Sequence, residues 1–178
     1  MNRMKKRIIL LFMFVLASFC YARQVSFQVV QHNNSVEEVT EEARVVEDAL
    51  IDSFFEYGYI VTNSEASIAR NYVDDSNLWK IGMNEAVSGY SDFFVQVILE
   101  FTEKFDETIN RNVMILDKAQ YRINDTVQLN ELGSGEFVCG LKINSPSDLA
   151  IVSDSLIFEI NKVLNAWGWM LWIKEYLN

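Results

Sequence analysis

The sequence is poor in the residues from which catalytic and metal centres are most often built. Its 178 residues include one histidine, one proline, two cysteines and seven glycines. The single histidine, His32, cannot form a histidine-rich zinc site, and the chain has no GxGxxG or Walker loop for a nucleotide. The sequence therefore predicts no catalytic residue, no metal ligand and no cofactor, and it favours a protein that is not an enzyme.

Positive charge is also scarce. The chain has 15 lysines and arginines against 25 aspartates and glutamates, a net charge of −10. Four basic residues lie in the first seven positions, so removal of a leader would leave 11 against 25, a net charge of −14. Such a chain repels phosphate groups, so nucleic acid is not an expected partner and anionic lipid headgroups are disfavoured.

An apolar run near the amino-terminus predicts export. The basic stretch NRMKKR precedes IILLFMFVLASF, a run that is too short for a stable membrane span and is typical of a secretory signal. Residues 1–22 are interpreted as this signal, with small residues Cys20 and Ala22 before cleavage at Arg23. Alternatively, LASFC is a degenerate lipobox, with bulky Phe19 before a lipidated Cys20. The expected location is periplasmic or secreted, or the outer membrane if Cys20 anchors the chain.

Either route leaves Cys139 as the remaining cysteine, so no internal disulfide is expected. It lies in GEFVCGLKI, an apolar run without a nearby histidine. This setting predicts a buried strand residue and not a nucleophile.

The first half of the chain predicts a strand, a long helix and a second strand. VSFQVVQ (25–31) is rich in β-branched residues, and a helix over 36–57 follows with Ser35 as its N-cap and Glu38 completing a capping box. Gly58 ends the helix, and YIVTN (59–63) is the next strand. The apolar stripe of the helix is Val39, Ala43, Val46, Leu50 and Phe54.

The middle of the chain predicts a second helix and then an antiparallel meander. Either Asp75 or Ser76 would cap the helix LWKIGMNEAVSG. DFFVQVILEFTEKF, NVMILDKAQYRIND, TVQLNEL and EFVCGLKI are the candidate strands, with GSG (133–135) as a turn.

A last helix is predicted from the clearest local signal in the chain, SPSD (145–148). Ser145 suits the N-cap, Pro146 the first helical position and Asp148 the third, and Gly168 is expected to interrupt the helix. Its apolar stripe is Leu149, Val152, Leu156, Ile160, Val163 and Trp167. The predicted fold is one α/β (α+β) domain over 23–178, a mixed sheet with an antiparallel meander packed against two long helices and one shorter helix.

Two stretches carry a family resemblance. ALIDSFFEYGYIVTN reads as helix, glycine and strand, and GYSDFFVQVILEF reads as small loop, acidic residue and buried strand. Together with the element order, they resemble the envelope domains grouped around the TolB amino-terminal domain and the penicillin-binding-protein activator LpoB. The resemblance covers about 25–165 and implies the fold, with no functional residue carried over, and the long tether of activator members is missing.

Three of the four tryptophans lie in the aromatic carboxyl-terminal segment 168–178 or directly before it. Three roles are open for this segment: covering the core, docking on a partner or a second copy, or lying in a membrane interface. The candidate partner-binding residues are Trp169, Met170, Trp172, Ile173 and Tyr176.

The sequence thus favours an exported, non-enzymatic envelope protein that binds another envelope protein or component. Two alternatives are a homo-oligomeric structural subunit and a glycoside hydrolase that cleaves cell-wall sugar with two carboxylates. The paired acids Asp74–Asp75 and Glu37–Glu38 are more typical of helix starts and solvated surface. Membrane contact is expected only through a lipidated Cys20 or an interfacial carboxyl-terminal segment.

Overall fold

The computed structural model of the chain describes residues 22–33, 36–143 and 145–177; of Tyr72, Pro146 and 168–177 it describes the backbone alone. The described residues form five strands and three helices in one α+β domain, as the sequence predicts. In chain order the elements are β1 (Gln24–His32), α2 (Glu41–Glu56), β2 (Ile60–Ala69), α3 (Tyr72–Ser88), β3 (Phe93–Asp106), β4 (Arg111–Asp125), β5 (Asn130–Lys142) and α4 (Pro146–Leu177).

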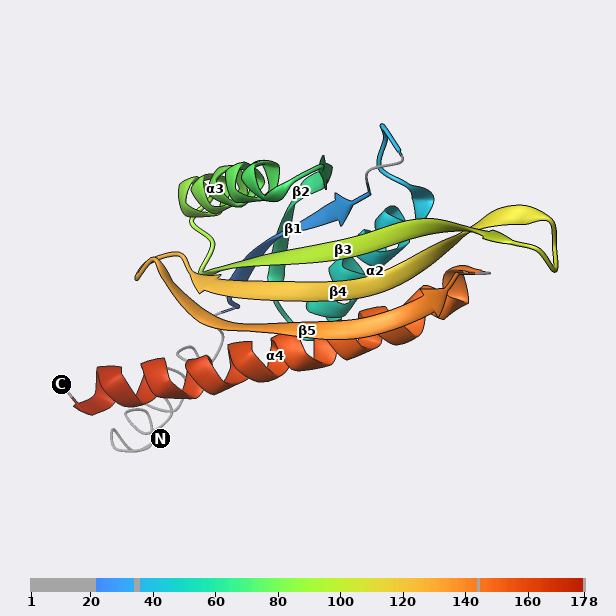
Figure 1. Cartoon of the computed structure of the whole chain (residues 1–178). Coiled ribbons are helices and arrows are strands. Elements are labelled where there is room, and N and C mark those ends of the chain that lie inside the picture. The colour runs from blue at the N-terminus through green and yellow to red at the C-terminus, as the bar shows by residue number, and fades with distance from the viewer. Residues whose placement is uncertain (1–21, 34–35, 144, 178) are drawn as a thin grey trace, which may run out of the picture.

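The sheet is mixed, with strand order β2-β1-β3-β4-β5. β1 pairs in parallel with both β2 and β3, whereas β3, β4 and β5 form the predicted antiparallel meander. β3 and β4 continue past the other strands as a two-stranded arm (Figure 1). The parallel pairs arise because α2 and α3 each carry the chain back across the sheet before the next strand begins.

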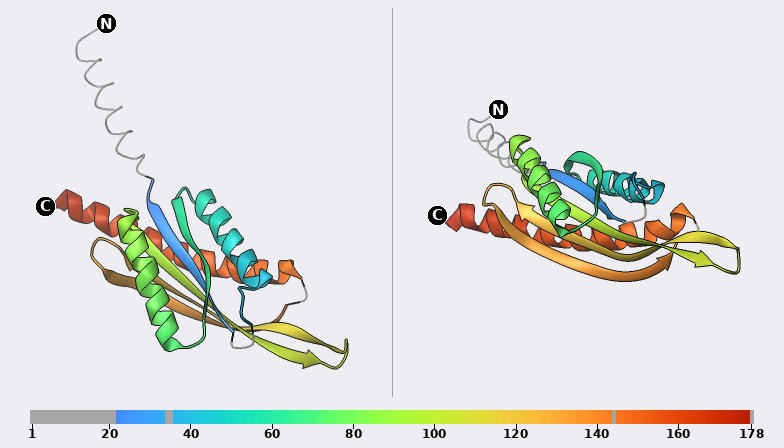
Figure 2. Two further views of the ribbon diagram at one scale, coloured as in Figure 1. Left: turned by 90° about the horizontal axis from the view of Figure 1, so that it is seen from above. Right: turned by 45° about the horizontal axis from the view of Figure 1, so that its top comes forward.

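One face of the sheet carries the main hydrophobic core. α2 and α4 lie side by side on this face, and α3 covers the opposite face (Figures 1 and 2). Because side chains alternate along a strand, every second residue of β1 and β3 points into this core. The fully buried positions include Val25, Phe27, Val29, Val95, Val97 and Leu99 from the strands and Ala43, Val46, Leu50, Phe54, Leu149, Leu156 and Ile160 from the helices.

The opposite face, beneath α3, is more polar. Gln28 of β1 and Gln96 of β3 are both buried there, and Gln96 Nε2 donates to Gln28 Oε1 at 3.1 Å. Arg122 of β4 donates to Gln96 Oε1 at 2.6 Å, and its guanidinium carbon lies 4.8 Å from the ring centroid of Trp79 on α3. This chain of contacts connects α3 to three strands across a face that apolar packing alone does not fill.

Two helices begin at places that the sequence does not predict. α2 begins at Glu41, because the Gln31 Oε1 atom of β1 accepts hydrogen bonds from the backbone nitrogen (2.8 Å) and hydroxyl (3.0 Å) of Thr40 and holds that residue extended. The predicted start at 36 with a Glu38 capping box is therefore wrong. α3 begins before both predicted caps, since the Asn71 side chain accepts from the nitrogens of Val73 and Asp74.

The turns of the meander also differ from those that the sequence predicts. The predicted GSG turn lies inside β5, and the real turn between β4 and β5 is 126–129, within the stretch TVQLNEL that was expected to be a strand. The start of the last helix is confirmed, with Asp148 Oδ2 accepting from the Ser145 nitrogen at 3.0 Å. The predicted interruption at Gly168 is wrong, because α4 continues through it to Leu177.

Candidate functional site

One end of the sheet presents large apolar side chains to solvent from two uncharged loops. We define the uncharged rim as residues 88–91, between α3 and β3, and 126–130, between β4 and β5. None of these nine residues is charged, although 22% of the whole chain is, and the acids Asp92, Asp125 and Glu131 directly border them. Three rim side chains are strongly exposed: Tyr90 at 90%, Val127 at 81% and Leu129 at 67%.

Hydrogen bonds hold the two loops of the rim together. The Thr126 nitrogen donates to the Asp92 carbonyl at 3.2 Å, and the Thr126 hydroxyl donates to the Ser91 carbonyl. Asp92 Oδ2 also accepts from the Gln24 nitrogen at 2.8 Å, which attaches the first residue of β1 to the same end. In the turn between β4 and β5, the backbone nitrogens of Val127 (2.8 Å) and Gln128 (2.7 Å) donate to Asp125 Oδ1. The exposed apolar side chains therefore stand on a fixed backbone.

α4 passes this rim and extends beyond it. Arg23, directly before β1, donates from Nη1 to the Leu164 carbonyl at 3.3 Å, and Leu164 is the last fully buried residue among the α4 side chains that the structure describes. Beyond the Arg23–Leu164 hydrogen bond, the backbone of α4 projects past the sheet at the end that carries the rim (Figures 1 and 2). The start of β1, the rim and the aromatic segment thus share one end of the molecule.

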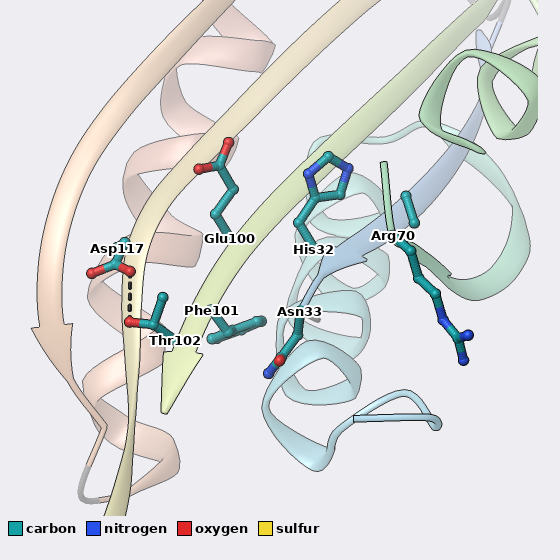
Figure 3. A pocket seen from close by; sticks show the side chains of 8 residues that line it. His32, Asn33, Arg70, Glu100, Phe101, Thr102 and Asp117 are labelled. Atoms are coloured by element: carbon teal, nitrogen blue, oxygen red, sulfur yellow. Dashed lines mark hydrogen bonds between the residues drawn. The ribbon is translucent and has the colours of Figure 1, made fainter. Parts of the chain in front are cut away.

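A second candidate site is a hollow of about 300 Å³ where β1 and β2 end. This is the carboxyl edge of the parallel strands, where ligands often bind in α/β sheets. Figure 3 shows the side chains pointing in several directions and not toward one centre. The lining residues are His32, Asn33, Ala69, Arg70, Glu100, Phe101, Thr102 and Asp117.

The two acids of the hollow are already engaged. Glu100 Oε1 lies 3.1 Å from Lys118 Nζ, and the hydrogen bond with Glu100 raises the pKa of Lys118. Asp117 Oδ2 accepts from the Thr102 hydroxyl at 2.6 Å (Figure 3). Both carboxylates thus serve as partners for residues of the neighbouring strand.

His32 lies in a polar stretch, QHNNS, that is typical of a solvent-exposed turn, but the structure places it in a strand. The residue ends β1, and its half-buried imidazole Nε2 lies 3.8 Å from Asp75 Oδ1 on α3. Neither atom has a hydrogen-bond partner. Asp74, the neighbour of Asp75 in the predicted acid pair, accepts a hydrogen bond from the Arg70 nitrogen just before α3. Among the described residues, no group of three or more histidine, cysteine or acidic side chains could hold a metal ion.

The remaining predicted residues fall into two groups. Cys139 does lie in a strand, where it is half-buried, and burial raises the pKa of its thiol. Cys20 and the side chains of Trp169, Met170, Trp172, Ile173 and Tyr176 lie outside the described residues, so their roles stay predictions. The structure adds the exposed residues of the uncharged rim. The sequence did not single them out, because apolar residues next to a strand look like a continuation of that strand.

No described helix combines the length and apolarity needed to cross a bilayer. The predicted weak fold-level resemblance to the TolB and LpoB domains is confirmed. TolB from Acinetobacter baumannii matches with 14% identity and a TM-score of 0.41 over 82% of this chain and 29% of that chain. The LpoB C-terminal domain from Salmonella enterica matches with 9% identity and a TM-score of 0.35 over 68% of this chain and 87% of that one.

Lipoprotein GNA1162 from Neisseria meningitidis is similar at 18% identity and a TM-score of 0.44, over 79% of this chain and 99% of that chain. At these identities the likenesses concern the fold alone. A search of curated proteins gave no significant match. The profile of a protein family described as "Uncharacterised protein" matches residues 24–146, which is more than half of the sequence, and the chain belongs to that family.

Proposed function

We propose that the chain is an exported cell-envelope protein that binds another envelope component and catalyses no reaction. The uncharged rim carries this proposal. Exposed Tyr90, Val127 and Leu129 on a fixed backbone form a contact surface, since large apolar groups gathered on a surface are typical of interaction sites. The predicted leader, residues 1–22, supports the export, and the aromatic segment after Trp167 lies at the same end of the molecule.

Two alternatives receive less support. A glycoside hydrolase needs two carboxylates that face a sugar, but in the hollow Glu100 is paired with Lys118 and Asp117 with Thr102. A homo-oligomeric subunit would bring copies with the same strong negative charge together. Binding to a different envelope component avoids both difficulties.

Fractionation of cells that express the chain with a carboxyl-terminal tag tests the export. We expect the tagged protein in the envelope or periplasmic fraction, with an amino-terminus at Arg23 or a lipidated Cys20. Edman or mass-spectrometric analysis of that terminus distinguishes the two routes. Recovery of the intact chain, with Met1 and the basic leader, from the cytoplasm would overturn the proposal.

Crosslinking in intact cells tests the binding. A photoreactive residue at position 127, on the uncharged rim, should give a discrete crosslinked product, whereas the same residue at position 109, on the far arm, should not. The Trp169→Ala, Trp172→Ala double variant should weaken the product at position 127. Equal products from both positions would show that the rim has no special role.

A further inference from the structure

We propose that the component contacted by the uncharged rim is the surface of a lipid bilayer with electrically neutral headgroups, and that the end of α4 lies in the same interface. This deepens the proposed function and rests on the export proposed above. It assigns the molecule an orientation, with the rim toward the membrane and the β3–β4 arm away from it.

The first argument is backbone strain at exposed apolar residues. Tyr90 and Leu129 have φ angles of 57° and 55°, in the left-handed region that favours glycine and asparagine. The turn at the opposite end of the molecule has Asn110 in this conformation, with a φ of 51°. Glycine or asparagine would suit these turns better, so the exposed tyrosine and leucine are unusual choices that a contact outside the fold would explain.

The second argument is the place where the rest of the chain joins the domain. The 21 residues before the described part contain the apolar run 8–19 and reach the domain next to Gln24. The Gln24 side chain donates to the Gly89 carbonyl at 3.1 Å, and its nitrogen bonds to Asp92. The predicted leader therefore joins the domain beside the rim during export, and a lipidated Cys20 would keep a membrane attachment at that place afterwards.

The third argument is the sequence of the projecting part of α4. Residues 168–177 contain two charged residues, Lys174 and Glu175, and seven apolar or aromatic ones. Helical spacing places six of the seven in one half of the helix, which is the pattern of an interfacial helix, and tryptophan and tyrosine favour the headgroup level. The six are Trp169, Met170, Trp172, Ile173, Tyr176 and Leu177.

Charge decides which surface is suitable. The chain carries a net charge of −10 with its leader and −14 without it, so an anionic bilayer or a second copy would be repelled. Neutral headgroups impose no such cost. The rim residues themselves are uncharged, and of the acids that border them Asp125 is buried and Asp92 is hydrogen-bonded to the Gln24 nitrogen. Five charged residues lie between positions 103 and 111 on the β3–β4 arm.

Vesicle binding tests the orientation. Protein exported from a gene with the Cys20→Ser substitution, which closes the lipid route, is sedimented with phosphatidylcholine vesicles and with vesicles containing phosphatidylglycerol. The rim variant Tyr90→Asn, Val127→Ser, Leu129→Asn should bind the neutral vesicles about tenfold more weakly or worse, because each apolar group adds to the partition energy. It should fold normally, since asparagine suits the left-handed positions, and circular dichroism checks this.

The matched control replaces exposed apolar residues of the arm. The Phe105→Ser, Ile109→Ser variant removes side chains that are 59% and 43% exposed and should bind as the parent does. The proposal is overturned if the parent does not bind neutral vesicles, if the rim variant binds like the parent, or if the arm variant is weakened equally. Any of these outcomes with normal export leaves the envelope location intact and removes the bilayer as the partner.

Tryptophan fluorescence gives an independent readout. In a Trp79→Phe variant, brominated phosphatidylcholine should quench the three tryptophans of α4. In a variant with phenylalanine at positions 167, 169 and 172, Trp79 of α3 is the remaining tryptophan. It should not be quenched, because its ring packs between α3 and the sheet against Arg122. Quenching of Trp79 alone, or of neither set, contradicts the orientation.

Discussion

Gly135 lies in the middle of β5, directly opposite Tyr121 of β4. A Cβ atom at this position would come within 2.6 Å of the Tyr121 ring, so the missing side chain is what makes room for the ring. Tyr121 is 7% exposed and contacts Phe137, with ring centroids 6.3 Å apart. In the sequence this glycine looks like part of a turn, but its role is close packing between strands.

We expect Gly135→Ala to destabilise the protein by about 1–3 kcal/mol, the usual cost of overpacking a filled site. Urea unfolding followed by circular dichroism measures the change. Ser134→Ala, at the exposed neighbouring position, is the control and should cost less than about 0.5 kcal/mol. If the ring contact is the cause, the cost should fall in a Tyr121→Leu background; an unchanged cost there would refute the explanation.

At the scale of whole elements, the N-cap residue Asn71 determines where α3 begins. Asn71 Oδ1 accepts from the nitrogens of Val73 (2.9 Å) and Asp74 (3.0 Å), and Asp74 in turn accepts from Asn71 Nδ2 at 3.0 Å. We expect Asn71→Ala to lower the free energy of unfolding by about 0.5–2 kcal/mol. Ser76→Ala, at the cap that the sequence suggests, should change it by less than about 0.5 kcal/mol. Chemical denaturation of both variants decides which residue caps the helix.

The elements that the sequence predicts well are those whose signals are local. The predicted stripes contain the buried apolar residues of α2 from Ala43 to Phe54 and Leu149, Leu156 and Ile160 of α4, because burial of one helix face follows from periodicity. Val152 is only half-buried, and the stripe of α4 misses the buried residues Ile157 and Leu164. Gly58, with a φ of 81°, ends α2 as predicted. Local patterns are sufficient for these features because the spacing of apolar residues and the stop glycine lie within a single stretch of sequence.

The features that the sequence misses depend on partners far away in the chain. The start of α2 depends on Gln31 from another element, and the half-buried position of His32 depends on Asp75 of α3. The rim depends on two loops, 35 residues apart at Thr126 and Ser91, that meet only in the folded sheet. No window of sequence contains both partners of these contacts, so periodicity and turn composition could not reveal them.

On the scale of the whole molecule, the two ends differ in character. One end has the uncharged rim, the start of β1 and the end of α4, whereas the other has the charged arm. On the arm, a hydrogen bond from Lys142 lowers the pKa of Asp106 to about 2, so this carboxylate stays ionised at any ordinary pH. A molecule polarised in this way has a natural orientation at an apolar surface.

The fold itself should not need the projecting part of α4. Among the side chains of that helix described up to Trp167, Leu164 is the last fully buried one, and from there to Leu177 the backbone extends about 20 Å, mostly past the sheet. Truncation after Trp167 should therefore change Tm by less than about 4 °C, the shift that roughly 1 kcal/mol produces in a domain of this size. Thermal circular dichroism of the exported protein with and without 168–178 measures this. A collapse of the truncated form would mean that the aromatic segment covers the core, and both its interfacial position and its role in binding would then have to be abandoned.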